Sequence, residues 1–479
     1  MSKILFVGAE VMPCAATGGL GDVMGSLPAA MKAADASGDI RVVLPLYGTV
    51  KEEWRAQMKT EAIFDLHLAW RTQYCGILSL VKDGVTYYFI DNEYYFKRDT
   101  LYGHFDDGER YAFFCMAALA LIEKVGFYPD VLHAHDWQSA LSVIYLNRLY
   151  RNRRGYENIK TVFTIHNIEY QGEYDFGILG DVFALGEDSR TLMEYDGCIN
   201  LMKGAIVSAD IVSTVSPRYA EEIRTPQYAH GLEYAINDNA YKLRGILNGI
   251  DYVYYDPATD AVIPKNFTAD AVADKIANKL ALQKALGLPE DGEKPMLAII
   301  SRLASHKGLD IVSEMAYGLL QYNDVQLVVL GKGEARYEQF FRELEKSFPT
   351  KARALIEYDR DLSKRIYAAC DIFVMPSASE PCGLSQMIAS RYGAIPVVRE
   401  TGGLYDSIKG YWEKDGEMLG NGFTFANYSS AELYDRICAA VDLWRNGEKR
   451  ERFVKKIMNT DFSWSVSAKR YLEMYNEII

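Results

Sequence analysis

The chain has 479 residues, with 52 Lys and Arg against 65 Asp and Glu, so its formal net charge is −13. This length corresponds to two or three domains with a substantial core. Apolar residues make up 49% of the chain and charged residues 24%, which is the balance of a globular protein and excludes a disordered one. The acidic balance also argues against nucleic acid as a partner, because affinity for a phosphate backbone depends on clustered Lys and Arg.

Nothing in the sequence indicates export or membrane insertion. Apolar residues open the chain, but Glu10 interrupts them too early for the core of a signal peptide. The longest apolar run, Tyr111–Ile122, is shorter than the roughly 20 residues that span a bilayer and predicts a buried helix. The seven cysteines are scattered and never spaced C-x-x-C, which is typical of reduced thiols. We therefore expect a cytoplasmic protein with no membrane partner.

Short apolar runs alternate with longer amphipathic stretches, the pattern of parallel sheets with crossover helices. In chain order the expected strands are Lys3–Gly8, Arg41–Leu46, Val85–Ile90, Asp130–Ala134, Lys160–Ile165, Ile211–Val215, Met296–Ile300, Gln326–Leu330, Ile372–Met375 and Ile395–Val398. A proline-bearing stretch separates the first six from the last four, and within it Ala269–Leu286 predicts the first helix of a second domain.

This division predicts an α/β protein with two Rossmann-like domains facing across a cleft. We expect the N-terminal domain over residues 1–250 and the second over residues 251–460. Ligands of open α/β sheets bind at the carboxyl ends of the strands, so we expect the site residues to follow the strands directly.

A glycine turn occurs once in each half. Thr17–Asp22 reads T-G-G-L-G-D, and Thr401–Asp406 repeats it as T-G-G-L-Y-D, a match that chance alone can also produce. Each turn would place bare backbone N–H groups at a helix N-terminus, where anions are stabilised. The first turn lacks the spacing of the dinucleotide fingerprint, so a plain structural turn is the alternative.

Two expected strands of the first half end in polar residues. His133 and His135 lie two residues apart on one strand, so their side chains point the same way. A metal site needs further ligands from elsewhere, and the alternative is a hydrogen-bond network at the strand end. The next strand runs into the polar stretch 164–172. This stretch is either a capped loop or part of a site, and its position at the strand end favours a site.

In the second half, Arg302 and Lys307 follow the strand Met296–Ile300. Two fixed cations there suit a diphosphate, whose departing charge they would stabilise; the alternative is a pair of solvated surface charges. Glu380 follows the strand Ile372–Met375 and precedes an expected helix start at residues 383–385. Its carboxylate would bind sugar hydroxyls or meet positive charge on a sugar ring, or else complement the helix dipole.

Asp359-Arg360-Asp361 spells the D-x-D string with which some glycosyltransferases hold a metal. Asp361 directly precedes the amphipathic stretch Leu362–Cys370, so we interpret it as a helix N-cap and expect no metal.

These motifs resemble those of bacterial glycogen synthase and plant starch synthase, the retaining glucosyltransferases of the two-Rossmann-domain (GT-B) type. The resemblance covers essentially the whole chain, in order. It is carried by Thr17–Asp22, His133–Trp137, His166-Asn167 with Gln171-Gly172, Asn248–Asp251, Ser301–Gly308, Glu380–Gln386 and Thr401–Leu404. Each motif is weak alone, but seven in the same order are specific.

The resemblance implies transfer of glucose from ADP-glucose to the non-reducing 4-hydroxyl of an α-1,4-glucan, with retention of configuration and without a cofactor. A front-face route, in which the leaving diphosphate assists the incoming hydroxyl, is the usual description of the family. Residues 461–479 would form a helix that crosses back onto the first domain.

Site residues carried over by the resemblance fall into two groups. The catalytic group is His166, Arg302, Lys307 and Glu380, in which both cations hold the donor diphosphate, Glu380 contacts the donor glucose and His166 lies by its 6-hydroxyl. The substrate-binding group is Gly18, Gly19, Asp22, Asp136, Asn248, Tyr358, Cys382, Gly383, Leu384 and Ser385. Within it, Tyr358 would stack on the nucleotide base and the amides of residues 382–384 would bind the sugar hydroxyls.

Two positions depart from the family pattern. Ala16 stands where the family usually has a lysine near the donor phosphates, and His306 replaces a common glutamine. The missing cation leaves the choice between ADP-glucose and UDP-glucose open. A UDP-glucose-preferring glucan synthase and a non-catalytic glucan-binding paralogue are therefore the alternatives, whereas a nicotinamide dehydrogenase is disfavoured because the fingerprint is absent.

Overall fold

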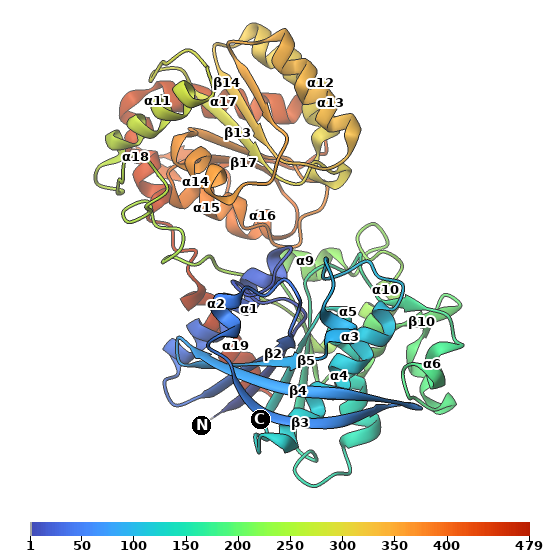
Figure 1. Cartoon of the computed structure of the whole chain (residues 1–479). Helices are drawn as coiled ribbons and strands as arrows, with labels where there is room; N and C mark the ends of the chain where they lie inside the picture. Colours follow the sequence, from blue (N-terminus) through green and yellow to red (C-terminus); the bar gives the residue numbers. More distant parts are fainter. Residues whose placement is uncertain (1) are drawn as a thin grey trace. The chain divides into compact units, whose positions relative to one another are not determined.

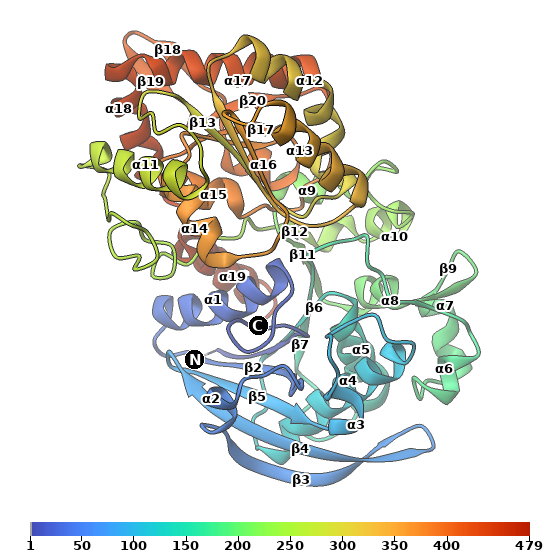
Figure 2. The ribbon, with the colours of Figure 1, turned by 45° about the horizontal axis from the view of Figure 1, so that its top comes forward.

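The computed structural model describes residues 2–479, which divide into two compact units. The first unit contains the chain up to Asn248 together with Trp464–Ile479, and the second is Gly249–Ser463. The last helix, α19 (Trp464–Asn476), therefore belongs to the first unit, where it packs beside α1 (Gly19–Ala34), as Figure 2 shows. The expected return of the C-terminal helix is confirmed.

The first unit is built on one mixed sheet, in the order β12-β11-β7-β6-β1-β2-β5-β4-β3. Its strands are β1 (Lys3–Val7), β2 (Asp39–Pro45), β3 (Lys59–Leu68), β4 (Arg71–Lys82), β5 (Val85–Asp91), β6 (Val131–His135), β7 (Lys160–Ile165), β11 (Ile211–Thr214) and β12 (Leu243–Gly245). The central strands are parallel and almost wholly buried, so they are apolar on both faces.

The long hairpin of β3 and β4 is antiparallel and was not among the expected strands. The two strands curve along one edge of the sheet (Figure 1). Most of the β3 side chains are exposed or half-buried, so polar residues interrupt the apolar pattern that marked the other strands.

Helices cover the first sheet on both faces. The longer ones are α1, α4 (Asp107–Lys124), α5 (Trp137–Tyr145), α8 (Leu201–Ser208) and α19, and the short ones are α2 (Glu52–Arg55), α3 (Glu93–Phe96), α6 (Ile178–Asp181), α7 (Arg190–Met193), α9 (Pro217–Glu222) and α10 (Glu233–Asp238). The apolar run 111–122 lies within α4 and is buried nearly all round, as expected. A small sheet pairs β10 (Cys198–Asn200) with β8 (Glu173–Tyr174) and β9 (Glu194–Tyr195).

The second unit has a parallel sheet in the order β15-β14-β13-β16-β17-β20. Its strands are β13 (Met296–Ile300), β14 (Gln326–Leu330), β15 (Ala352–Leu355), β16 (Ile372–Met375), β17 (Ile395–Arg399) and β20 (Phe423–Phe425), and β18 (Trp412–Lys414) pairs with β19 (Glu417–Leu419) in a separate hairpin. The expected strands match β13, β14 and β16 at both ends; the short edge strands β15 and β20 were not expected.

Helices flank this sheet, with α12 and α13 on one face and α11, α14, α15 and α18 on the other (Figure 1). They are α11 (Lys275–Ala285), α12 (Leu309–Tyr322), α13 (Ala335–Ser347), α14 (Arg360–Ala369), α15 (Ser385–Arg391), α16 (Gly402–Ser407), α17 (Ser430–Arg445) and α18 (Gly447–Met458). The helix expected over Ala269–Leu286 is shorter than predicted, because a turn and a 3-10 helix (Val272–Asp274) occupy its first part.

The N-cap of α14 is Asp359 and not Asp361, so that prediction is wrong. The Asp359 carboxylate accepts a hydrogen bond from the Leu362 amide at 2.9 Å. A capping carboxylate reaches the amide three residues ahead, and Asp359 has the extended backbone of a cap, whereas Asp361 already lies inside the first turn.

No helix among residues 2–479 combines the length and the apolar character required to cross a membrane. All seven cysteines of the chain are free thiols.

Candidate active site

The carboxyl ends of β6 and β7 bring Asp136 and His166 together. The two strands are parallel neighbours, and each of these residues is the first after its strand. The His166 amide donates to Asp136 Oδ1 at 2.7 Å. Asp136 has a φ of 57° and a ψ of 178°, a conformation that residues other than glycine rarely adopt, and its carboxylate reaches the His166 amide at the next strand end.

The three histidines at these strand ends form the hydrogen-bond network that was one of the two expectations. His133 Nδ1 lies 2.6 Å from the Tyr475 hydroxyl of α19, and its Nε2 lies 2.6 Å from the Thr164 hydroxyl. His135 Nδ1 lies 2.9 Å from His166 Nε2. Among the described residues, no group of three or more His, Cys, Asp or Glu side chains is arranged to hold a metal ion.

Burial determines the charge of these groups. It lowers the pKa of His166 to about 3 and the pKa values of His133 and His135 well below the ordinary value. It also raises the pKa of Asp136 to about 7, against the opposing effect of two backbone N–H donors. The imidazoles are therefore neutral at physiological pH and act as hydrogen-bonding groups and not as acids.

The first glycine turn presents only some of its amides bare. Those of Thr17 and Gly18 are occupied, whereas those of Gly19 and Leu20, the first two residues of α1, have no acceptor in the part of the chain that the structure describes. The buried Glu10 carboxylate accepts from the Thr17 amide at 2.6 Å and from the Gly18 amide at 3.1 Å. It also accepts from the hydroxyls of Thr17 and Tyr102, each at 2.7 Å. A carboxylate of the chain itself thus binds the first two amides of the turn, and the two amides at the start of α1 stay available to another acceptor.

The other first-unit residues of the expected site lie at α1 and at the end of the unit. Gly18 and Gly19 are exposed, and a Cβ at either would meet no atom within 4 Å, so the space beside the turn is open. Asp22 lies in the first turn of α1 and is half-buried. Asn248 is buried, and its Oδ1 has no hydrogen-bond partner in the described part of the chain.

In the second unit, the loops after the neighbouring strands β13 and β16 pack together. The Ala378 amide donates to the His306 carbonyl at 2.9 Å, and Lys307 Nζ lies 2.7 Å from Glu380 Oε2. The Ser377 hydroxyl donates to the same carboxylate oxygen at 2.9 Å. Lys307 and Glu380, both expected in the site, therefore form one mostly buried ion pair.

Arg302, unlike Lys307, is not paired with another side chain among the described residues. It lies just after β13, is exposed, and its side chain makes no hydrogen bond or ion pair with any other of residues 2–479. A cation at the carboxyl edge of a parallel sheet, unpaired within the chain, is available to an anionic ligand.

The loop from Cys382 to Ser385 leads into α15. Cys382 is buried, Gly383 has a φ of 71°, and Ser385 is the first residue of the helix. The amides of Gly383 and Leu384 find no acceptor in the part of the chain that the structure describes, so they are free to bind a ligand oxygen at the helix start.

The second glycine turn packs directly against the Glu380 loop. The Gly403 amide donates to the Glu380 carbonyl at 3.1 Å, so this amide is not bare, contrary to expectation. A Cβ at Gly402 would lie 1.9 Å from the Glu380 carbonyl oxygen and one at Gly403 2.0 Å from that of Cys382. Glycine is required at both positions because two backbone segments meet there.

Tyr358 lies between β15 and α14 with 79% of its surface exposed. Its hydroxyl accepts from Arg360 Nε at 3.0 Å, which restrains the side chain while leaving the ring open to a ligand.

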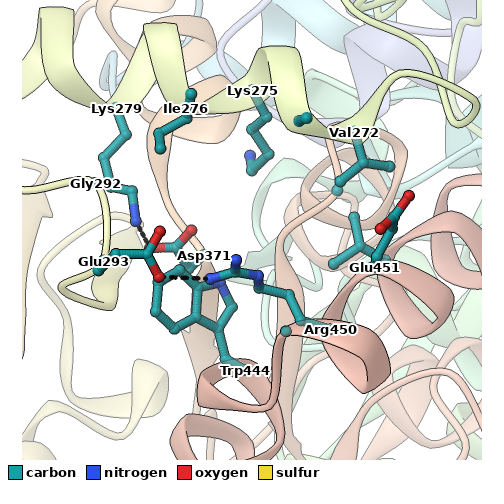
Figure 3. A pocket seen from close by; sticks show the side chains of 14 residues that line it. Val272, Lys275, Ile276, Lys279, Gly292, Glu293, Asp371, Trp444, Arg450 and Glu451 are labelled. Atoms are coloured by element: carbon teal, nitrogen blue, oxygen red, sulfur yellow. Dashed lines mark hydrogen bonds and ion pairs between the residues drawn. The ribbon is translucent and has the colours of Figure 1, made fainter.

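A cavity of about 330 Å³ lies elsewhere in the second unit, among α11, α17 and α18 (Figure 3). It is at the opposite edge of the sheet, because Asp371 and Gly393 of its wall precede β16 and β17. Lys279 pairs with Asp371 at 2.8 Å and Arg450 with Glu293 at 3.5 Å. Its charged side chains are largely paired internally, so they identify no ligand.

Several residues at or in contact with these strand ends could not be predicted from the sequence. Glu10, Tyr102, Ser377 and the partnership of His135 with His166 are visible only in the structure. Glu10 is separated from Tyr102 by 92 residues, and no local pattern connects them. The one usable signal was position, since His135 and Ser377 each lie near the carboxyl end of an apolar strand.

Family models match both parts of the chain. Residues 3–238 match the model of the starch synthase catalytic domain, and residues 283–460 match that of glycosyl transferases group 1. The glycogen synthase of Clostridium beijerinckii is 45% identical over 479 residues, covering 99% of each chain, and that of Geobacillus stearothermophilus is 43% identical, covering 100% of this chain and 98% of the relative.

Two solved structures are also similar to this chain. The catalytic domain of starch synthase IV from Arabidopsis thaliana, bound to ADP and acarbose, superposes with a TM-score of 0.89 at 34% identity and covers 99% of both chains. Sucrose-phosphate synthase from Thermosynechococcus elongatus, at 16% identity and a TM-score of 0.61, shares the fold. The chain therefore belongs to the glycogen and starch synthase family, glucosyltransferases of the two-domain GT-B fold.

Proposed function

We propose that this glycogen synthase transfers glucose from ADP-glucose to the non-reducing 4-hydroxyl of an α-1,4-glucan, with retention of configuration. The observation that carries the proposal is the group at the carboxyl edge of the second sheet. There, the free cation Arg302, the Lys307–Glu380 pair and the free amides at the start of α15 lie on the loops after β13 and β16.

This group suits a sugar diphosphate. Arg302 and Lys307 would bind the diphosphate and stabilise the negative charge that grows on it as the glycosidic bond breaks. Glu380 holds Lys307 in place and would bind sugar hydroxyls through its remaining oxygen, while the Gly383 and Leu384 amides would bind others. Tyr358, with its exposed ring, would stack on the base.

The first unit would supply groups for the transferred glucose. His166 would donate to or accept from a sugar hydroxyl as a neutral imidazole, since burial keeps its pKa about 3. Asp136 orients the His166 backbone, and Asn248 Oδ1 is a buried acceptor without a partner among residues 2–479. Gly18, Gly19 and Asp22 would line the open space beside the first glycine turn.

ADP-glucose is proposed over UDP-glucose because the Arabidopsis starch synthase structure contains ADP. The departure at Ala16 bears on this choice. A Cβ at Gly21 would lie 2.3 Å from the Ala16 Cβ and 3.3 Å from Glu10 Oε2, so position 16 is beside the Glu10 carboxylate. A lysine there would be close enough to pair with Glu10, whereas the present chain leaves Glu10 to neutral donors.

The direct test is a radiolabelled-donor assay with glycogen as acceptor, run with ADP-glucose and UDP-glucose side by side. Faster incorporation from ADP-glucose is expected. Preference for UDP-glucose would overturn the donor assignment, and binding to glycogen without incorporation from either donor would favour the non-catalytic paralogue. The family membership and the retained Arg302, Lys307, Glu380 and His166 support the enzyme.

A paired substitution tests the roles of the cations. Lys307→Ala should lower kcat by about 100-fold or more, because it removes a fixed charge facing the leaving group. Ala16→Lys should change kcat by less than about tenfold, since Arg302 and Lys307 already supply the charge. Lys346→Ala, an exposed lysine of α13, is the matched control. Comparable small effects at positions 307 and 16 would remove Lys307 from the leaving-group role.

The free thiols support a cytoplasmic location, which we also propose. All seven cysteines are unpaired, and three of them are partly exposed to solvent. Unpaired thiols of this kind suit a reducing compartment.

A further inference from the structure

His135 contacts His166 and has no role in the proposed function, yet within residues 2–479 its ring makes one hydrogen bond and has one unpartnered nitrogen. The two rings share one hydrogen bond, between His135 Nδ1 and His166 Nε2 at 2.9 Å. The other nitrogen of His135, Nε2, is buried and has no partner in the described part of the chain. His135 itself has no exposed surface and is stacked on the Phe6 ring at 5.5 Å.

Only one proton can lie between two neutral imidazoles, so there are two arrangements. If His166 donated from Nε2, the proton of His135 would be on its own Nε2, where a buried N–H would have no acceptor. If His135 donates from Nδ1, its Nε2 is a bare lone pair instead. A buried N–H without an acceptor is the rarer and more costly of the two defects, so the second arrangement is favoured.

The second arrangement also fixes His166. Because its Nε2 is then an acceptor, its own proton is on Nδ1. His166 Nδ1 has no protein partner among residues 2–479, and the residue is only half-buried. The chain thus leaves one N–H donor of His166 for a ligand.

We propose that His135 is a positioning residue: it donates from Nδ1 to His166 Nε2, holds that imidazole in one tautomer, and leaves the Nδ1–H of His166 to donate to a hydroxyl oxygen of the transferred sugar. The identity of the ligand rests on the proposed function. The tautomer does not, because it is a property of the protein without substrate.

The decisive measurement is long-range ¹H–¹⁵N NMR of the ligand-free full chain with ¹⁵N-labelled imidazoles. The chain has seven histidines, and the signals are assigned by single substitutions. The expected spectrum shows His135 and His166 each protonated at Nδ1 and unprotonated at Nε2. A His166 proton on Nε2 would overturn the proposal, whether or not the enzyme transfers glucose. Conversely, an expected spectrum with no glucose transfer would overturn only the proposed function.

Three variants separate positioning from mere packing. His135→Phe keeps a ring against Phe6 but removes the donor, so His166 should lose its single tautomer and kcat should fall by about 10–100-fold, with a smaller change in KM. His135→Asn retains an N–H near the place of Nδ1 and should restore the tautomer and much of the rate. Tyr475→Phe, which removes a buried bond from the neighbouring His133, should leave the His166 tautomer unchanged.

An unchanged His166 tautomer in His135→Phe would contradict the proposal. If that variant does not fold, the wild-type spectrum and His135→Asn still decide, because loss of the tautomer in His135→Asn would contradict it equally.

Discussion

Three carboxylates near the strand ends differ in how their charge is balanced. Glu380 is paired with a cation, Lys307, at 2.7 Å. Glu10 accepts four hydrogen bonds, all from uncharged donors. Asp136 accepts from backbone amides while burial raises its pKa to about 7. For Asp136 the folded protein therefore favours the protonated form, so its negative charge destabilises the fold at higher pH.

This cost predicts a pH-dependent effect of Asp136→Asn. The carboxyl has a pKa near 7 in the folded state against 3.8 when unfolded, so the folded state binds the proton more tightly. Its contribution to stability is complete below pH 3.8 and is lost as the pH rises towards 7. Asn keeps an acceptor oxygen, has the same side-chain shape as Asp at this backbone conformation and carries no charge. The variant should therefore melt at a higher temperature than the wild type at pH 8, by at least about 3 °C, and by less at pH 5.

Asp83→Asn is the matched control for this melting experiment. Asp83 also has a positive φ, of 52°, but is exposed, so its variant should shift the melting temperature little at either pH. A gain for Asp136→Asn that is equal at pH 5 and pH 8 would show that the charge is not the cause.

For single residues, the sequence predicted which residue types follow the strands, but not which side chains they bind. Position after an apolar strand was enough to select the stretch 164–172, Arg302, Lys307 and Glu380 as candidates, whereas His166 was singled out within its stretch by the family resemblance. The partners come from distant parts of the chain: Tyr475 meets His133 across 342 residues and Glu380 meets Lys307 across 73. Part of the amides expected to be bare at the glycine turns, those of Thr17, Gly18 and Gly403, are occupied for the same reason, since a distant or looping segment supplies the acceptor.

At the scale of elements, the buried parallel strands were predictable because they are apolar on both faces. The β3–β4 hairpin was not, because its exposed face breaks the pattern, and the short edge strands β12, β15 and β20 are too brief to stand out. The return of α19 to the first unit followed from family resemblance and not from any feature of the helix itself.

The packing of α19 yields a prediction at this scale. The Tyr475 hydroxyl lies 2.6 Å from His133 Nδ1, and both side chains are almost completely buried. Tyr475→Phe leaves that nitrogen unpartnered and should lower the free energy of unfolding of the first unit by about 1–3 kcal/mol, measured by chemical denaturation. Tyr322→Phe, at an exposed tyrosine of α12, should change it by less than about 0.5 kcal/mol. Equal effects would contradict a buried bond between α19 and β6.

At the scale of the whole molecule, the proposed binding of a diphosphate is compatible with the net charge of −13, because Arg302 and Lys307 place two cations on the single loop between β13 and α12. The chain also contains 34 tyrosines, more than its 20 Phe and 6 Trp together, and these tyrosines differ in their surroundings. Tyr358 is exposed and is the tyrosine proposed to stack on the nucleotide base, whereas others such as Tyr145 and Tyr392 are buried in the core.

The second unit has the construction of an independent domain. It is one continuous segment, Gly249–Ser463, with its own sheet and core. Its two ends are joined to each other: the Ile250 amide donates to the Phe462 carbonyl at 2.8 Å, and the Tyr252 hydroxyl to the Thr460 carbonyl at 3.1 Å. The first unit is not one continuous segment, because it includes α19 from the far end of the chain.

We therefore expect residues 249–463, expressed alone, to fold and to bind ADP within about tenfold of the full chain's affinity, without transferring glucose. Arg302, Lys307, Tyr358 and the α15 amides are all present in this fragment, whereas His166 and Asp136 are not. Circular dichroism and calorimetric titration with ADP measure the two properties, and Arg302→Ala in the same fragment should weaken ADP binding by about tenfold or more. A folded fragment that does not bind ADP would show that the nucleotide needs groups from the first unit.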